Sequence, residues 1–183
     1  MNRSRGSRAT WQWNINSRDS VIADVIRSRS ITSGTTMKLL LMLEDDHDRI
    51  RRFRAIVARH HPDAVLKIAR TAPNFETEYW SLNDTPDLIC LDHDLFTDSP
   101  DEPDPGDGRD VSAFLITRLA KCPALIHSTN AHAADSMMFA MRDAGWTVDR
   151  IAPIGDDWIE SYWYPVALEM IERGTDRSES MEM

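Results

Sequence analysis

The sequence predicts an α/β domain in which a parallel sheet of five strands is covered by helices on both faces. Between residues 38 and 171, five apolar segments of strand length alternate with five segments of helical periodicity. The central segment, Asp87–Leu91, contains no alternating polar residues, which is typical of a strand buried on both faces. Since each crossover between parallel strands is right-handed, alternating strands and helices build a sheet with helices on both sides.

The boundaries of the elements follow from periodicity and from turn residues. The predicted strands are 38–43, 64–69, 87–91, 124–127 and 147–151, and the predicted helices are 48–60, 73–82, 110–119, 131–144 and a last one from Asp156 or Asp157 through Ile171. In the first helix, apolar residues recur at helical spacing and arginines occupy the other face. The loop 97–108 contains three prolines and two glycines, so it is predicted to be irregular.

Three segments of the chain differ in composition. Residues 1–36 are rich in Ser, Arg, Asn and Thr and have too few apolar residues for a core, so they are predicted to be a disordered extension. This extension is either a basic arm that contacts a partner or a segment without a role. The folded domain is predicted to span 37–173, followed by a flexible tail at 174–183.

Charge restricts the partners of this chain. The formal net charge is −9, and residues 37–183 hold 15 basic and 28 acidic residues, which gives −13. An acidic body binds nucleic acid poorly, because contacts with the phosphate backbone require basic groups. No segment has the apolar length that spans a bilayer, and Cys90 and Cys122 are predicted to be buried thiols. We therefore expect no tight non-specific nucleic-acid binding, no membrane contact and a cytoplasmic location.

The expected topology of such a sheet is the flavodoxin-like strand order 2-1-3-4-5. This order makes the first and third strands neighbours, so Glu44-Asp45-Asp46 and Asp92-His93-Asp94 meet at the carboxyl edge of the sheet. The fourth strand lies beside the third and adds His127-Ser128-Thr129-Asn130. Ligands of open α/β sheets bind at this edge, so the functional site is predicted there.

The predicted metal ligands are the carboxylates of Glu44, Asp45, Asp92 and Asp94. Acidic side chains gathered at one edge of a sheet repel each other unless a cation lies among them. Oxygen ligands suit Mg²⁺ or Mn²⁺, with waters completing the octahedron. The alternative is a set of solvated loop acids, of which Asp46 or Asp48 caps the first helix.

The predicted catalytic residues are His93, His127 and Asp92. Two histidines at the ends of adjacent strands can divide the work on a phosphodiester: one activates water and the other protonates the leaving oxygen. A carboxylate such as Asp92 or Asp94 would orient an imidazole ring. Imidazole also suits Zn²⁺ or Mn²⁺, so the histidines are alternatively metal ligands. A third alternative is a structural role.

The predicted phosphate-binding residues are Ser128, Thr129 and Asn130, which are hydrogen-bond donors directly before a predicted helix. The N-terminus of a helix attracts anions, so a phosphate oxygen fits there. Alternatively, Thr129 or Asn130 only caps the helix. Arg109, the basic residue beside the acidic loop, is either a phosphate clamp or a surface arginine.

These features resemble the receiver domain of response regulators over residues 37–172. In that family an acidic cluster follows strand one, an Asp follows strand three and a Ser or Thr ends strand four. Here those positions are Glu44-Asp45-Asp46, Asp92 and Ser128-Thr129. The resemblance implies a receiver-like three-layer sandwich.

Two further segments bear on the resemblance to receivers. Asp107-Gly108-Arg109-Asp110 is similar to the Asp-Gly segment that opens the helix after the phosphoacceptor. Receivers also carry a lysine at the end of strand five. Here Arg150-Ile151-Ala152-Pro153-Ile154-Gly155 contains no lysine, and Arg150 lies inside the strand. Phosphotransfer is therefore not the first prediction.

Leu91-Asp92-His93-Asp94-Leu95 and Ile126-His127-Ser128-Thr129-Asn130 are similar to the motifs of cyclic-phosphate processing receiver domains. This resemblance implies action on the cyclic phosphate ends of nucleotides or RNA. The predicted function is binding or metal-dependent hydrolysis of a small cyclic phosphate or phosphorylated nucleotide, with a homodimer or a protein partner as further candidates. The alternatives are a stand-alone receiver phosphorylated on Asp92 and a degenerate receiver that acts as a binding module.

Overall fold

The computed structural model describes residues 37–181, with side chains as far as Gly174. The extension 1–36, predicted to be disordered, lies outside the described residues. The strands are β1 Leu39–Leu43, β2 Val65–Ala69, β3 Leu88–Leu91, β4 Ala124–His127 and β5 Val148–Ile151. The helices are α2 His47–His60, α3 Ala72–Ser81, α4 Gly108–Ile116, α5 Ala131–Asp143, the π-helical segment η1 Ile159–Trp163 and α6 Tyr164–Met181.

The five strands form one parallel sheet in the order β2-β1-β3-β4-β5. This order confirms the predicted fold class. Leu43 at the end of β1 pairs in register with Leu91 at the end of β3. The polar segments that follow these two residues therefore leave the sheet at the same level.

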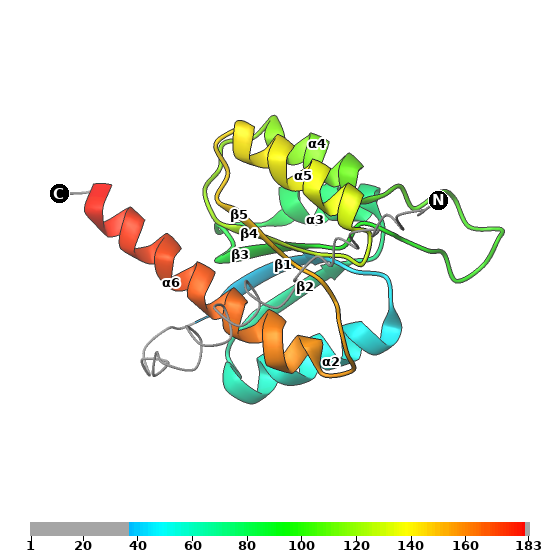
Figure 1. Cartoon of the computed structure of the whole chain (residues 1–183), viewed down its shortest axis with the longest axis horizontal. Coiled ribbons are helices and arrows are strands. Elements are labelled where there is room, and N and C mark those ends of the chain that lie inside the picture. Colours follow the sequence, from blue (N-terminus) through cyan, green and yellow to red (C-terminus); the bar gives the residue numbers. More distant parts are fainter. Residues whose placement is uncertain (1–36, 182–183) are drawn as a thin grey trace, which may run out of the picture. The chain divides into compact units, whose positions relative to one another are not determined.

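Helices cover both faces of the sheet (Figure 1). Helices α3, α4 and α5 pack on one face, and α2, η1 and α6 pack on the other. Within β1, Leu41 and Leu43 face the first layer, whereas Leu40 and Met42 face the second. A strand buried on both sides needs apolar residues at successive positions, which is why β1 and β3 lack the alternation of an exposed sheet.

Side-chain caps fix the starts of the helices that lead into the site. Asp46 accepts a hydrogen bond from the Arg49 N–H at the start of α2, and Asn130 accepts one from the Ala133 N–H at the start of α5. Both had been predicted as candidate caps. The prediction that Asp156 or Asp157 caps the last helix was wrong. Its first turns are π-helical, and η1 begins without a side-chain cap.

Helix α6 extends to Met181, so the segment predicted as a tail is helical from 174 to 181. Its flexibility stays a prediction. Of the aromatic side chains just before α6, Trp158 and Trp163 are buried and Tyr162 is exposed; the ring centroids of Trp163 and Phe53 lie 4.6 Å apart. A homodimer or a protein partner, the two further candidates named above, stays a prediction. Within residues 37–181, no helix combines the length and the apolar character that crossing a membrane requires.

Candidate functional site at the carboxyl edge of the sheet

Three carboxylates meet where β1 and β3 end. Glu44 and Asp45 follow β1 directly, and Asp92 follows β3. All three residues are buried, and one oxygen from each lies within 4.8 Å of the others. The pairing of β1 with β3 brings together residues that are 47 or more positions apart in the chain. We refer to Glu44, Asp45 and Asp92 as the acidic triad.

The cation inside the acidic triad is Arg49, which the sequence analysis did not assign to the site. Arg49 Nη2 lies 2.7 Å from Asp92 Oδ2, 2.9 Å from Glu44 Oε1 and 3.6 Å from Asp45 Oδ1. Arg49 is in the first turn of α2, and side chains of a helix point back toward its N-terminus. The spacing of four residues between Asp45 and Arg49 is the signal that would have found this contact.

Backbone N–H groups hold the carboxylates in place. Asp45 Oδ2 accepts from the Phe96 N–H at 2.8 Å, and Asp92 Oδ1 accepts from the His93 N–H at 2.6 Å. The second oxygen of each of these two carboxylates faces Arg49. Asp45 Oδ1 and Glu44 Oε2 are buried without a hydrogen bond from the described residues. Two oxygens of the triad therefore accept no hydrogen bond from the described residues.

Burial raises the pKa of Asp45 and of Asp92, and the neighbouring charge of Glu44 raises both further. For Arg49, burial alone would lower the pKa of the guanidinium. The carboxylates of Glu44 and Asp92 outweigh this effect and raise it. Arg49 is therefore charged, and a single positive charge balances three acidic groups.

The donors of the acidic triad fit a hard divalent cation. They supply oxygen only, and two of the buried oxygens have no hydrogen bond. The fourth predicted ligand, Asp94, lies outside this group in the described part of the chain, and its role as a ligand stays a prediction. Asp94 Oδ1 instead lies 2.8 Å from His93 Nδ1 and accepts from Asn130 Nδ2 at 3.4 Å. Its carboxylate is committed to the neighbouring imidazole and amide.

His93 lies between two carboxylates. Its Nδ1 is 2.8 Å from Asp94 Oδ1, and its Nε2 is 3.5 Å from Asp107 Oδ2. The ring is buried, and Nε2 makes no hydrogen bond within the described residues. A proton on Nδ1 that donates to Asp94 leaves Nε2 as the basic nitrogen. This arrangement suits a group that moves a proton.

His127 is fully buried and lies in a different environment. Its ring stacks on Trp158 at 5.9 Å and contacts Phe53 at 5.3 Å. Its Nε2 is 3.3 Å from Glu44 Oε2, which is an ion-pair distance with too poor a geometry for a hydrogen bond. Within residues 37–174, His93 and His127 share no hydrogen-bond or ion-pair partner. The two histidines therefore have different partners, and their action as an acid–base pair stays a prediction.

Ser128, Thr129 and Asn130 form the turn into α5. Ser128 is buried, and its hydroxyl accepts from the Asn130 N–H at 3.1 Å. Asn130 is the N-cap of α5. Thr129 is exposed at the same turn. Ser128 and Asn130 thus serve the local structure, and a phosphate contact by any of the three stays a prediction.

Gly108 lets the start of α4 close against the site. Its N–H donates to the carbonyl of His93 at 3.0 Å. A Cβ built on Gly108 would lie 2.4 Å from the carbonyl oxygen of Asp92 and 2.8 Å from His93 Cα. The preceding residue, Asp107, caps α4 and places its second oxygen near His93 Nε2. Only glycine permits this close approach.

No basic residue at the end of β5 reaches Asp92. Arg150 Nε instead binds Asp135 Oδ1 on α5 at 2.8 Å. This geometry agrees with the view that Arg150 does not replace the receiver lysine. Arg109 is exposed at the start of α4. Among these arginines, Arg49 is the one that contacts Asp92.

A shallow depression of about 330 Å³ adjoins the acidic triad. It is lined by Asp45, Asp46, His47, Asp48, Arg70, Phe96, Thr97 and Asp98. The Phe96 side chain is 72% exposed, although its backbone N–H is bound to Asp45. An aromatic ring therefore lies at the rim of the depression, on a residue whose backbone N–H binds a carboxylate of the triad.

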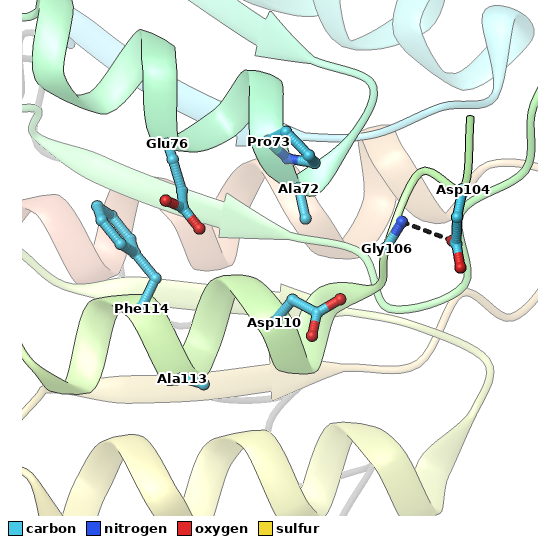
Figure 2. Close-up of a pocket in the computed structure, with 8 residues that line it drawn as sticks. All are labelled: Ala72, Pro73, Glu76, Asp104, Gly106, Asp110, Ala113 and Phe114. Atoms are coloured by element: carbon cyan, nitrogen blue, oxygen red, sulfur yellow. Dashed lines mark hydrogen bonds between the residues drawn. The ribbon is translucent and has the colours of Figure 1, made fainter. Parts of the chain in front are cut away.

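A larger cleft of about 520 Å³ lies between α3 and α4, and Figure 2 shows the residues that line it. They are Ala72, Pro73, Glu76, Asp104, Gly106, Asp110, Ala113 and Phe114. None of them belongs to the acidic triad. We therefore take the smaller depression, which shares Asp45 with the triad, as the candidate ligand site.

Solved structures similar to this chain include receiver domains. A CheY-like response regulator receiver domain from Methanospirillum hungatei JF-1 is 16% identical, with a TM-score of 0.53, over 75% of this chain and 98% of that one. The phosphorylated cyanobacterial phytochrome response regulator RcpA is 21% identical, with a TM-score of 0.52, over 75% and 92%. The Mn²⁺-bound response regulator Rcp1 is 22% identical, with a TM-score of 0.50, over 69% and 94%. These likenesses show a shared fold.

Among curated proteins, none matches this sequence. Residues 39–143 match the family described as the cyclic-phosphate processing receiver domain. That match includes β1 to β4, the acidic triad, His93 and the turn into α5. The chain belongs to the family of cyclic-phosphate processing receiver domains.

Proposed function

We propose that this protein binds a small cyclic phosphate at the carboxyl edge of its sheet and hydrolyses it with a divalent cation. The observation that carries this proposal is the buried acidic triad beside an imidazole held between two carboxylates, in a chain of this family. Such a site offers both a place for a cation and a group that moves protons.

Glu44, Asp45 and Asp92 would hold the cation, with Mg²⁺ or Mn²⁺ best suited to their oxygens. Such an ion neutralises charge on the phosphate and lowers the pKa of a bound water. The described residues supply no fourth acidic ligand, so the remaining positions are free for water and phosphate oxygens.

His93 would act as the general base in ring opening. Its Nε2 takes the proton from the attacking water while Asp94, at Nδ1, holds the ring in orientation and stabilises the imidazolium. The His93 imidazolium then returns this proton to the leaving oxygen of the ribose as the P–O bond of the ring breaks, which completes the phosphomonoester. His127 would not supply that proton, because its ring is fully buried between Phe53 and Trp158. His127 would position Glu44 instead.

The ligand would be a nucleotide and not a long RNA. Phe96 offers an exposed ring on which a base stacks, at the rim of the depression that shares Asp45 with the triad. Thr129 and the N-terminus of α5 would contact phosphate oxygens. The net charge of −9 disfavours extended contact with a phosphate backbone.

The test is incubation of the full chain with 2′,3′-cyclic and 3′,5′-cyclic nucleotides, each with Mg²⁺, Mn²⁺ or Zn²⁺, followed by phosphorus NMR. We expect metal-dependent ring opening that His93→Gln removes and His60→Gln keeps, because His60 is an exposed residue at the C-terminal end of α2. The position of the product phosphate identifies the bond that was cleaved. Equal turnover by the His93 variant would refute its role.

The second candidate is a signalling receiver phosphorylated on Asp92. The position of Asp92 directly after β3 favours it, and the absence of a lysine after β5 disfavours it. Acetyl phosphate distinguishes the two: labelling of Asp92 without turnover of any cyclic nucleotide would support the signalling receiver. Neither labelling nor turnover would leave a binding module.

A further inference from the structure

Arg49 occupies the place where the acidic triad would hold a metal ion. We propose that Arg49 is a displaceable counter-cation: it balances the triad in the absence of a divalent ion, leaves when one binds, and then contacts the phosphate of the ligand. This inference rests on the proposed function for its metal and its ligand. It adds a residue and an order of events that the proposed function does not contain.

The guanidinium and a divalent ion compete for one position. Nη2 lies 2.7 Å and 2.9 Å from oxygens of Asp92 and Glu44, and 3.6 Å from Asp45. A small divalent ion sits about 2.1 Å from each oxygen ligand. One oxygen from each carboxylate lies within 4.8 Å of the others, so an ion bound by all three would draw on the same carboxylates that Nη2 now contacts. Both groups therefore compete for these carboxylates.

Two buried oxygens indicate that the guanidinium satisfies the triad incompletely. Glu44 Oε2 and Asp45 Oδ1 have no hydrogen bond from the described residues, and the two side chains are 0% and 7% exposed. Buried carboxylate oxygens without hydrogen bonds are costly. A divalent ion brings twice the charge and bonds more than one of these oxygens. It therefore has a reason to displace Arg49.

Arg49 can leave without unfolding α2. Its side chain is 24% exposed, so the head group has a path to solvent. The first turn of α2 is held by the backbone N–H of Arg49, which donates to the Asp46 carboxylate at 2.8 Å. The guanidinium takes no part in that cap. A change of side-chain rotamer is enough to open the position.

A displaced Arg49 is well placed for a phosphate. The planar guanidinium binds phosphate oxygens in pairs. The other arginines near the site are engaged elsewhere: Arg150 binds Asp135, and Arg70 binds Asp98 at 2.6 Å and 2.8 Å. Arg49 would thus supply, from α2, the positive charge that a receiver supplies from the end of strand five.

The first measurement is a titration of the full chain with Mn²⁺ in the absence of nucleotide. The electron paramagnetic resonance signal of the free ion reports how much Mn²⁺ is bound. We expect Arg49→Gln to bind Mn²⁺ at least about tenfold more tightly than the wild type. Arg51→Gln is the matched control. It removes the same charge from the start of α2, but Arg51 pairs with the exposed Asp48 and not with the triad. Arg49→Lys keeps the charge and is expected to bind Mn²⁺ about as weakly as the wild type.

The second measurement is binding of inorganic phosphate at saturating Mn²⁺. Here both Arg49→Gln and Arg49→Lys are expected to bind roughly tenfold more weakly, since neither keeps the paired donors of a guanidinium. Opposite effects of Arg49→Gln on ion and phosphate are the signature of a displaced counter-cation. Unchanged Mn²⁺ affinity in Arg49→Gln, or equal gains in Arg51→Gln, overturns the displacement. Unchanged phosphate affinity overturns the phosphate contact.

If Arg49→Gln is poorly folded without metal, the Tm with and without Mn²⁺ tests the displacement instead. Mn²⁺ should then raise the Tm of this variant more than that of the wild type, and an equal or smaller rise counts against the displacement. These measurements use no cyclic nucleotide. A protein that shows the displacement but opens no ring refutes the proposed reaction alone, and one that opens rings without the displacement refutes this inference alone.

Discussion

At the scale of single residues, Asp92 contacts both a backbone N–H of the site and the guanidinium of Arg49. Its two oxygens are held by the His93 N–H and by Arg49, and burial raises its pKa. A cation bound to the folded state alone would stabilise the protein, by about 2.7 kcal/mol at one hundred times its Kd.

We therefore predict that Mg²⁺ raises the Tm of the wild type and that Asp92→Asn abolishes the rise, because a neutral amide binds the ion poorly. Thermal unfolding with and without Mg²⁺ measures this effect. Asp48→Asn is the control, since Asp48 is an exposed acid of α2 outside the triad. No rise with any divalent ion in the wild type would count against the metal site.

The two histidines should respond differently to substitution. His127 is fully buried between Phe53 and Trp158, so His127→Ala leaves a cavity and should lower the free energy of unfolding by roughly 2–4 kcal/mol. His93→Gln should change stability by less than about 1 kcal/mol while removing turnover. Urea unfolding followed by circular dichroism measures both. A His127→Ala variant as stable as the wild type would contradict the packing described for this ring.

At the scale of elements, the start of α4 depends on Gly108. Gly108→Ala would place a methyl group 2.4 Å from the Asp92 carbonyl, so α4 or the segment after β3 must move. We expect a loss of roughly 1–3 kcal/mol in the free energy of unfolding and a smaller Tm rise with Mg²⁺. Gly174→Ala is the control: its Cβ would lie 3.4 Å from Pro123, and it should cost little. Equal stability of the two variants would contradict the close approach.

Ion pairs of Asp98 hold the loop after β3 against Arg70 and His47. Asp98 accepts hydrogen bonds from Arg70 and lies 3.1 Å from His47, which together lower the pKa of Asp98 to about 2. A carboxyl whose pKa is lower in the folded state stabilises it above the ordinary value of 3.8, and this contribution is lost as the pH falls toward 2. The exposed position keeps the contribution small.

We therefore expect Asp98→Asn to lower Tm slightly at pH 6, and this difference from the wild type should vanish by about pH 2. Thermal unfolding of both proteins across this range measures it. Arg51→Gln, which breaks an exposed pair elsewhere on α2, shows how much any surface ion pair contributes. A Tm difference that is the same at both ends of the range would disprove the ionic anchor.

At the scale of the whole molecule, the sheet separates two apolar layers, and Cys90 lies in one of them. It is fully buried in β3, and burial raises the pKa of its thiol. Cys122, which precedes β4, is partly exposed. The expectation of a buried thiol thus holds for Cys90 in full and for Cys122 in part.

We predict that Cys122 reacts with a thiol reagent before Cys90, and that Cys90 reacts only at the rate of global unfolding. The reason is that no local opening of an edge exposes the central strand of the sheet. Mass spectrometry of the labelled protein at increasing urea follows both thiols. Simultaneous labelling of the two in the absence of urea would show that the sheet opens locally.

Much of this fold could be predicted because its signals are local. Unbroken apolar runs indicate strands that are buried on both faces. Asp46 and Asn130 indicate where helices begin, because their side chains accept hydrogen bonds from the first backbone N–H groups of a helix. The last helix was harder, because a π-helical turn has no sequence signal comparable to a side-chain cap. The approach of α4 to the site was also missed. The Asp-Gly pair was visible in the sequence, but the carbonyl that excludes a Cβ was not.

The sequence alone predicted the strand order, the edge where the site lies and three of the carboxylates that meet there, because alternating buried strands and helices are typical of this topology and ligand sites lie at the carboxyl edge of its sheet. Only the tertiary structure decided which groups touch. It placed Arg49 inside the triad, turned Asp94 to His93 and buried His127 among aromatic rings. Side-chain direction at the end of a strand depends on what packs around it, and those neighbours come from segments distant in the chain.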